Sequence, residues 1–330
     1  MATLPMGTFI NLYPYIVSQD KTLVLDDKYI NNLELIFSNQ PVVLTGTGLC
    51  SSALKWDVDY LTKNMGTEKN VVFLSSNKKF KYCDDHKIQQ YMPDYNPPIK
   101  RLDLSFKEFI KRLKEWKTGD VRLYLQQALN TNVGEALVAD FVNFDWRWLN
   151  HQQKINNWGP LTSNLLLVGM EGNITPVHYD EQQNFFSQLI GYKRCLLFSP
   201  KHYDKLYPHP VYHPCDRQSK VDFDDPDFNR FPGLDKLEGY ETILGPGDVL
   251  YIPMYWWHQI ESKPDAGYTV SVNFWYKLTY LSRVLNHAIY PDLIFFGNIQ
   301  KHFSETLQSL LNYLQPLSSG LLMRSYSSAS

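Results

Sequence analysis

Short segments of alternating apolar and polar residues dominate the chain from about residue 163 onward. They follow one another with turn-forming residues between them, a spacing typical of a β-sandwich or barrel. Alternation with period two places one face of each strand against a core. The predicted strands cover residues 164–169, 184–191, 193–200, 241–245, 247–253, 258–262 and 268–277. The pattern therefore predicts a mainly β core.

The first 160 residues mix helical and strand-like patterns. Ser105 followed by Glu108 is a capping box, which predicts the start of an amphipathic helix. Three apolar residues mark the buried side of that helix, namely Phe106, Ile110 and Leu113. Apolar runs predict strands at 41–46 and 70–76, and spacings of three or four predict helices at 29–40, 51–66 and 141–153. We therefore expect N-terminal α/β elements that flank the β core.

Two further regions differ from these patterns. Residues 200–240 are rich in Pro, Asp and aromatic residues, and so long a loop inside a compact domain is usually functional. After residue 281 apolar residues recur every three or four positions, at Phe296, Ile299, Phe303, Leu307, Leu310 and Leu314. Core packing explains this stripe, and a dimer interface is the alternative. The expected domains are N-terminal elements (1–120), a β core (121–280) and a helical C-terminal region (281–330).

The charge balance argues against a polyanionic partner. The chain has 32 basic and 34 acidic residues without a long run of either sign, so we expect no nucleic acid and no anionic membrane as partner. It has no apolar run of about 18 residues, and its start lacks the pattern of a signal peptide. Its four Cys include no C-x-x-C pair, which is typical of reduced thiols. We expect a soluble intracellular protein.

The tripeptide His-Tyr-Asp occurs twice, at 178–180 and 202–204, and could hold two ligands of a metal ion. On a strand, residues i and i+2 point the same way, so His178 and Asp180 can share a metal while Tyr179 faces the other side. The second copy follows Ser-Pro and leads into Leu-Tyr-Pro, a turn context without a fixed pleat. The first copy is therefore the candidate site.

A non-haem Fe(II) oxygenase needs two His and one carboxylate. The candidate for the second His is His258, on a strand that follows the Gly-Pro-Gly-Asp turn at 245–248, because a barrel brings distant strands together. Taken alone, a His beside two Trp is more simply a packed core residue. His209 and His213 stand four positions apart and look like a pair of metal ligands. The prolines at 208, 210 and 214 exclude the helix that would align their side chains.

Four segments together carry a resemblance to a known family. They are TPVHYD, GYKRCLLF, GPGDVLYIPMYWWHQIES and VSVNFWYK, and their combination resembles the JmjC family of Fe(II) and 2-oxoglutarate dioxygenases. Residues 161–200 and the loop 206–228 are similar to the asparaginyl hydroxylases of that family. The similarity weakens at the N-terminus and after Lys277.

The resemblance implies a double-stranded β-helix, the cupin-like JmjC jelly roll, with N-terminal α/β elements and C-terminal helices. It implies Fe(II) bound by His178, Asp180 and His258, with 2-oxoglutarate and O2 as cosubstrates. It also implies that Lys193 meets the far carboxylate of 2-oxoglutarate, since a Lys inside a barrel is costly unless it meets an anion.

By the same resemblance, Thr175 and Tyr124 complete the hydrogen bonds of that carboxylate, while Asn184 and Asn273 orient the other end of the cosubstrate. Without the resemblance, Lys193 would be taken for an exposed strand residue.

The resemblance assigns substrate recognition largely to the long loop. Arg217 and Gln218 would bind the side-chain amide of a target Asn, because an amide carries both donors and an acceptor. Tyr82, Gln126 and Trp275 would line the peptide groove. From the residues alone, Arg217 and Gln218 are simply polar loop residues, and Trp275 could equally belong to the core.

The implied activity is β-hydroxylation of Asn in the C-terminal activation domain of hypoxia-inducible factor α subunits and in ankyrin-repeat proteins. It would couple O2 supply to transcriptional repression, in cytoplasm and nucleus, by a homodimer formed through the C-terminal helices. Two alternatives stay open. One is a JmjC lysine demethylase, which should recognise a methylammonium group, and the other is a catalytically silent module that binds ankyrin repeats.

Overall fold

The computed structural model describes residues 9–11, 15–16, 36–130, 133–264 and 267–278. The chain divides into two compact units, residues 1–283 and 284–330, and every described residue belongs to the first unit. The predicted apolar stripe that begins at Phe296 lies outside the described residues, as does most of the helix predicted at 29–40.

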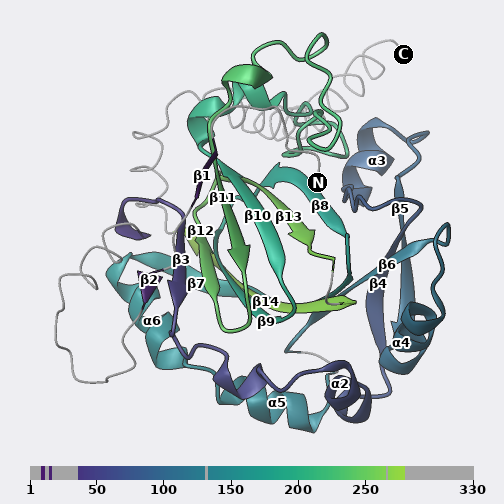
Figure 1. Cartoon of the computed structure of the whole chain (residues 1–330), viewed down its shortest axis with the longest axis vertical. Coiled ribbons are helices and arrows are strands. Elements are labelled where there is room, and N and C mark those ends of the chain that lie inside the picture. The colour runs from purple at the N-terminus through teal and green to yellow at the C-terminus, as the bar shows by residue number, and fades with distance from the viewer. Residues whose placement is uncertain (1–8, 12–14, 17–35, 131–132, 265–266, 279–330) are drawn as a thin grey trace, which may run out of the picture. The chain divides into compact units, whose positions relative to one another are not determined.

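Two sheets form the framework of the described part (Figure 1). The first has the strand order β1 (Phe9–Asn11), β11 (Gly239–Leu244), β10 (Lys193–Phe198), β13 (Trp257–Ser262) and β8 (Ile174–Tyr179). The second has the order β2 (Tyr15–Ile16), β3 (Val42–Thr45), β12 (Val249–Ile252), β9 (Gln183–Ile190), β14 (Tyr268–Leu278), β7 (Trp158–Met170), β6 (Arg122–Ala128), β4 (Lys69–Ser75) and β5 (Ile99–Ser105). All pairings are antiparallel except those of β1 with β11 and of β2 with β3.

The chain passes back and forth between the two sheets. β8, β10, β11 and β13 lie in the first sheet, and β9, β12 and β14 lie in the second. This alternation winds the strands into a double-stranded β-helix, the jelly roll, in which two antiparallel sheets face each other. The predicted mainly β class and its jelly-roll core are therefore confirmed, and every strand predicted from residue 164 onward is present.

Side-chain alternation along the strands decides which residues face the inside of the jelly roll. On β9, Phe185 and Leu189 pack in the large cluster that the helices cover, whereas Phe186 packs between the two sheets with Leu167 and Leu197. Successive strand residues point to opposite faces. When one residue of a strand is known to pack in the outer cluster, the residues next to it in the sequence therefore face the inside of the jelly roll.

Helices cover the outer face of the second sheet. They are α2 (Val58–Asn64), α4 (Phe106–Glu115), α5 (Glu135–Val142) and α6 (Trp146–Ile155), while α3 (Asp85–Tyr91) lies apart from them (Figure 1). The capping box of α4 is present, with the Ser105 side chain accepting from the Glu108 backbone N–H. The sequence patterns did not predict α5, which is short and uniformly apolar over much of its length. No helix in the described ranges is long and apolar enough to cross a membrane.

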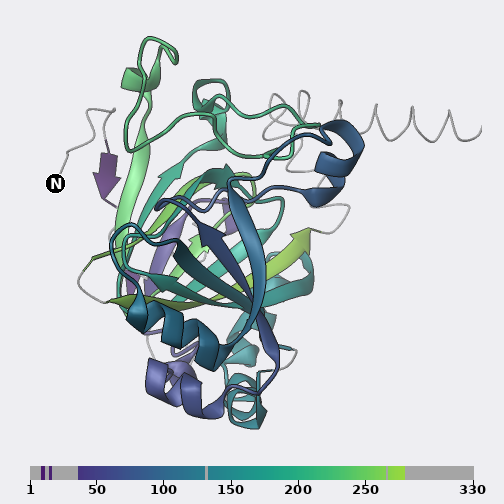
Figure 2. The same cartoon turned by 90° about the vertical axis from the view of Figure 1, so that its right-hand side faces the viewer.

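The segment 200–240 joins β10 to β11 and contains only short 3-10 turns, η2 (Pro200–His202), η3 (Asp204–Leu206) and η4 (Leu234–Lys236). It lies at the end of the jelly roll opposite α2 and α5 (Figures 1 and 2). Its apolar residues, among them Phe223, Phe231 and Leu234, pack against the outer face of β8, β10 and β13. The segment is thus held in place by a small core of its own.

Candidate metal centre

The strand β8 carries His178 and Tyr179 of the first His-Tyr-Asp copy, ends just before Asp180, and forms one edge of the first sheet. It pairs with β13 so that His178 lies opposite His258 and Thr175 lies opposite Ile260, with a bulge between the two pairs. Because a bulge adds one residue to one strand, Thr175 and His178 can both face inward although they are three positions apart. Tyr179 points outward and packs on Trp257, as predicted.

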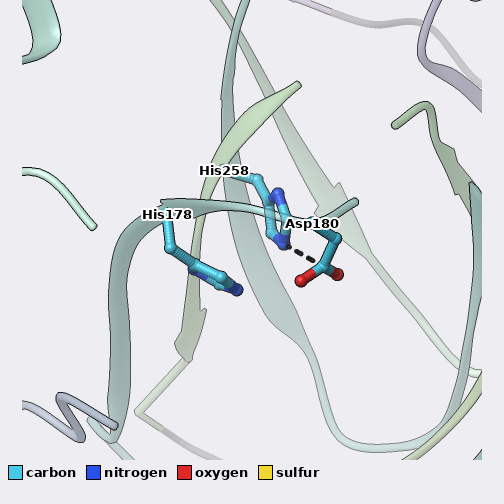
Figure 3. Close-up of side chains that lie close together, drawn as sticks. All are labelled: His178, Asp180 and His258. Atoms are coloured by element: carbon cyan, nitrogen blue, oxygen red, sulfur yellow. Dashed lines mark ion pairs between the residues drawn. The ribbon is translucent and has the colours of Figure 1, made fainter. Parts of the chain in front are cut away.

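The structure brings His178, Asp180 and His258 together (Figure 3). One ligand atom from each residue lies within 4.8 Å of the others, and His258 Nε2 is 4.0 Å from Asp180 Oδ2. The imidazole centroids of the two His are 4.2 Å apart. Two imidazoles and a carboxylate converging from two strands are the donor set of a facial metal triad.

Hydrogen bonds orient both imidazoles for metal binding. His178 Nδ1 lies 2.9 Å from the Pro176 carbonyl oxygen, and His258 Nδ1 lies 2.9 Å from that of Trp256. A carbonyl can only accept, so Nδ1 carries a proton, and in the neutral imidazole Nε2 keeps the lone pair that binds a metal. Burial, followed by the neighbouring His178, lowers the pKa of His258 to about 4, so this imidazole is neutral near pH 7.

Asp180 follows β8 directly, and two hydrogen bonds from other parts of the chain hold it in place. Its carbonyl oxygen accepts from the Tyr255 N–H at 2.8 Å, and its Oδ2 accepts from Trp275 Nε1 at 3.0 Å. Burial by itself raises the pKa of Asp180, but the two imidazoles, the Trp275 N–H and the Arg217 guanidinium together hold it below its usual value. The carboxylate is therefore ionised and available to a cation.

The second His-Tyr-Asp copy falls in the turns η2 and η3, as predicted. His202 is buried there, and Asp204 belongs to the following turn rather than to a strand. His209 and His213 do stack on each other at 4.2 Å, but His213 Nδ1 accepts the Cys215 N–H at 2.9 Å. Among the described residues, only His178, Asp180 and His258 form a group able to hold a metal.

Lys193 lies inside the jelly roll and is 1% exposed. Its Nζ donates to the Tyr124 hydroxyl at 3.2 Å and lies over the Phe186 ring, and within the described part of the chain no carboxylate is within ion-pair distance. Gly169 on β7 pairs with Tyr124 on β6, and its lack of a side chain leaves room for the Tyr124 ring, which a Cβ would meet at 3.1 Å. A buried ammonium without a counter-ion is costly, so this position calls for an anionic ligand.

Two buried amides also lack partners. Asn184 Oδ1 and Asn273 Oδ1 make no hydrogen bond within the described residues. Both side chains point inward, because Phe185 on β9 and Phe274 on β14 pack in the outer cluster. An orphaned amide is typical of a site that a polar ligand completes. The Lys193 ammonium therefore fits a carboxylate of a bound ligand, and the two amide oxygens call for hydrogen-bond donors in the same interior.

Two segments that are distant in the sequence form hydrogen bonds with the edge of β8 that faces away from β13. Phe80 N–H donates to the Ile174 carbonyl at 2.8 Å, and the Ser219 N–H donates to the Val177 carbonyl at 2.9 Å. His178 forms a bridge with Gln218. The proposed substrate residues thus lie directly beside a metal ligand.

A pocket of about 390 Å³ opens at this edge, and its lining includes Tyr82, His178, Asp180, Arg217 and Gln218. The Gln218 side chain donates to the Tyr82 carbonyl, and Gln126 donates to the Tyr82 hydroxyl. Arg217 and Gln218 therefore share one pocket with two of the three candidate ligands, His178 and Asp180. Neither Trp275 nor Gln126, both predicted to line the peptide groove, is part of this lining, and the Trp275 indole N–H donates to Asp180 instead.

One part of the pocket lining was not predicted from the sequence. It is formed by Cys83, Asp84 and Lys87 at the start of α3, and Lys87 Nζ makes a 2.6 Å ion pair with Asp216. The Asp84 N–H donates to the Pro214 carbonyl at 2.9 Å. The opposite charges of Lys87 and Asp216 are a weak indication in the sequence that the two segments could pair. Only the fold shows that they meet.

The jelly roll and the facial triad define an oxygenase-type cupin. The family described as "Cupin-like domain" matches residues 30–281, and the chain belongs to this family. Its relatives place it in the JmjC superfamily, whose members are Fe(II)- and 2-oxoglutarate-dependent oxygenases, and the fold and site described here agree with that class.

Three relatives illustrate the range of that superfamily. "Lysine-specific demethylase 8" of Danio rerio is 37% identical over 72% of this chain and 53% of its own length. "Jumonji C domain-containing protein 5" of Drosophila melanogaster is 29% identical over 73% of this chain and 55% of its own. "tRNA wybutosine-synthesizing protein 5" of Gallus gallus is 27% identical over 72% of this chain and 70% of its own. The chain spans about half the length of the first two. Of the three names, one refers to lysine, one refers to tRNA and one states no substrate.

Proposed function

We propose that this protein is an Fe(II)- and 2-oxoglutarate-dependent asparagine β-hydroxylase. The observation that carries the proposal is the position of Arg217 and Gln218, which line the pocket beside His178 and Asp180. An amide needs a donor and an acceptor, and the Gln218 carboxamide together with the Arg217 guanidinium supplies both. Resemblance of the loop 206–228 to asparaginyl hydroxylases supports the same assignment.

In the proposed reaction, His178, Asp180 and His258 would hold Fe(II). Lys193, with the hydroxyls of Tyr124 and Thr175, would bind the far carboxylate of 2-oxoglutarate, and Asn184 and Asn273 would orient its other end. Bound Fe(II), 2-oxoglutarate and O2 together supply the oxidation that inserts one oxygen atom into a C–H bond and releases succinate and CO2.

The protein's own contribution is to fix geometry. The Nδ1–H bonds to Pro176 and Trp256 keep both imidazoles aimed at one point, and Trp275 keeps the Asp180 carboxylate turned toward them. A target Asn held by Arg217 and Gln218 would present its β-carbon to that point. Small displacements of a positioned group cost much of the rate, so these bonds matter for turnover.

A lysine demethylase fits this pocket less well. Arg217 makes no ion pair with any described residue, and its positive charge helps to lower the pKa of Asp180. Lys87 also lines the pocket. A methylammonium substrate would be repelled by uncompensated positive charge at close range. Three acidic residues line the pocket: Asp216 is paired with Lys87, Asp84 accepts from the backbone N–H groups at the start of α3, and Asp180 belongs to the metal group. Each is thus engaged and poorly placed to attract a second cation.

The proposed substrates are Asn residues in the C-terminal activation domain of hypoxia-inducible factor α subunits and in ankyrin-repeat proteins. The proposed homodimer and the location in cytoplasm and nucleus rest on the same resemblance. Because O2 would be a substrate, turnover would follow oxygen supply and could couple it to transcriptional repression.

The test is mass spectrometry of Asn peptides from both sources after incubation with Fe(II), 2-oxoglutarate and O2. We expect one added oxygen atom on the target Asn, and none on a matched peptide with Ala in its place. A methyl-lysine peptide assayed in parallel tests the demethylase alternative. Succinate release without any modified peptide, or no succinate beside a bound ankyrin-repeat protein, would refute the proposal and favour a different substrate or a silent binding module.

A further inference from the structure

Two thiols from distant parts of the chain meet at the wall of the pocket. Cys83 Sγ and Cys215 Sγ are 3.3 Å apart although the residues are separated by 132 positions. The Asp84 N–H, next to Cys83, donates to the Pro214 carbonyl, next to Cys215, at 2.9 Å. This backbone bond holds the two segments side by side, so the close approach of the sulfurs is a feature of the fold.

Polar groups surround this pair and favour a shared proton. Tyr95 Oη lies 3.2 Å from Cys215 Sγ and packs edge-on against His213. The hydrogen bond from Cys83, the Tyr95 hydroxyl and the Lys81 ammonium overcome burial and lower the pKa of Cys215 to about 6. The same contact raises the pKa of Cys83. One thiol and one thiolate therefore face each other near pH 7.

The pair also differs from the other cysteines in access to solvent. Cys83 is half-buried and lines the 390 Å³ pocket, while Cys215 lies directly behind it and is 0% exposed. Cys50 and Cys195 are buried in apolar cores, and burial raises the pKa of each thiol to about 12. A reactive thiol needs both thiolate character and an approach for its partner, and only the pair at the pocket combines them.

We propose that Cys83 and Cys215 form a peroxide-reactive dithiol that closes reversibly into a disulfide. The proton on Cys83 first passes to the Cys215 sulfur, 3.3 Å away. The Cys83 thiolate then attacks a hydroperoxide in the pocket and takes one oxygen as a sulfenic acid, while the O–O bond breaks and the other oxygen takes up a proton and leaves as alcohol or water. The Cys215 sulfur then attacks the Cys83 sulfur, and the sulfenic oxygen leaves as water with the proton of the second thiol. The two thiols are oxidised by two electrons, and the hydroperoxide is reduced.

Closure of this bond would act on the substrate loop. The sulfurs must approach to about 2 Å, which draws the two segments together. Cys83 follows Tyr82, whose carbonyl accepts from Gln218, and Cys215 lies two positions before Arg217. This consequence rests on the proposed hydroxylase function. We expect a several-fold higher KM for the Asn peptide in the oxidised protein and an unchanged KM for 2-oxoglutarate.

The bond itself is tested without any activity. The purified full chain is treated with hydrogen peroxide before Fe(II) is added, and unreduced peptides are mapped by mass spectrometry. We expect a Cys83–Cys215 cross-link with the loss of two hydrogen atoms, reversed by dithiothreitol. Cys83→Ser and Cys215→Ser should each remove the cross-link, and Cys50→Ser should keep it. Oxidation of Cys83 to a sulfinic acid without a cross-link, or a cross-link to Cys50 or Cys195, would overturn the proposal.

The regulatory consequence has its own readout. The cross-linked protein is loaded with Fe(II), and KM for the peptide is measured before and after dithiothreitol, with Cys83→Ser as the variant that peroxide should not affect. Equal KM values for fully cross-linked and reduced protein would overturn the effect on the loop. Absence of peptide hydroxylation in both states would refute the proposed function while leaving the cross-link result intact.

Discussion

Two carboxylates in this protein have opposite relations to their surroundings. Asp140, on α5, is held by donors from the protein itself: Trp56 Nε1 at 2.9 Å, the Tyr60 hydroxyl at 2.7 Å and Lys55 Nζ at 2.8 Å. Asp180 receives one side-chain N–H from the described residues, that of Trp275. Its nearest other neighbours are the imidazoles of His178 and His258.

The difference separates a structural group from a ligand. Around Asp140 every near neighbour is a hydrogen-bond donor, so the protein satisfies the charge and the cluster ties α5 to α2 and to the segment before it. Around Asp180 the Nε2 atoms of His178 and His258 are acceptors, and acceptors that converge on a carboxylate repel one another unless a cation lies between them. Repulsion among groups that the protein does not itself relieve is typical of a site that binds a ligand.

The largest expected effect follows from removing the ligand carboxylate. Asp180→Ala should lower turnover by about a thousandfold or more, roughly 4 kcal/mol in transition-state free energy, since one ligand of the metal is lost. It should not lower the Tm, because the carboxylate satisfies few groups of the protein. The measurements are succinate release and thermal denaturation of wild type and variant.

The second His-Tyr-Asp copy provides the matched control for this variant. Asp204→Ala changes the same residue type in the same tripeptide, but Asp204 lies in the turn η3. Turnover should stay close to that of wild type. Equal losses in the two variants would mean that the metal centre has been assigned to the wrong copy.

The opposite outcome is expected at the structural carboxylate. Asp140→Ala should lower the free energy of unfolding by about 3 kcal/mol, because it leaves the buried Trp56 N–H and the Tyr60 hydroxyl without an acceptor. The half-exposed Lys55 contributes little to this loss. Turnover per folded molecule should be retained. Urea denaturation gives the stability, and a loss of turnover in fully folded Asp140→Ala would break the distinction between the two carboxylates.

Lys193 extends the comparison from anions to a cation. Lys193→Met should raise KM for 2-oxoglutarate about 30-fold, which corresponds to roughly 2 kcal/mol of lost ion pairing. Its Tm should equal or exceed that of wild type, because the variant removes a buried charge without a counter-ion. Steady-state kinetics and thermal denaturation test both parts. Lys201→Met, at an exposed Lys of η2, should leave both unchanged, whereas a lower Tm for Lys193→Met would show that the ammonium is structural.

The smallest expected effect is a change in the free energy of unfolding with pH. Burial raises the pKa of Asp140, but its bonds to Lys55, Trp56 and Tyr60 outweigh burial and keep the pKa below 3.8. The stability that this shift contributes is therefore present above the unfolded-state pKa of about 3.9 and is lost as the pH falls through the lower folded-state value. The stability gap between wild type and Asp140→Asn should narrow toward pH 3. A gap that widens in acid, measured by urea denaturation, would contradict the sign.

Much of the framework could be predicted because it depends on local chemistry. Each strand predicted from alternation after residue 164 is present, and Ser105 with Glu108 marked the start of α4. The strand β8 was not among them, because it was inferred from the His-x-Asp spacing. The contrast between the two His-Tyr-Asp copies also came from their neighbours in the sequence. The helix α5 was missed, since a short and mostly apolar segment has no clear period.

The sequence by itself determined the mainly β class, the strand that carries His178 and the turn that carries His202, because these depend on neighbours a few positions away. Only the tertiary structure decided which distant groups meet. The β8 bulge that turns both Thr175 and His178 inward, the burial of Lys193 without a counter-ion, and the contact of Cys83 with Cys215 arise from pairing between segments far apart in the chain. Such pairings are set by packing and register, which no local pattern encodes.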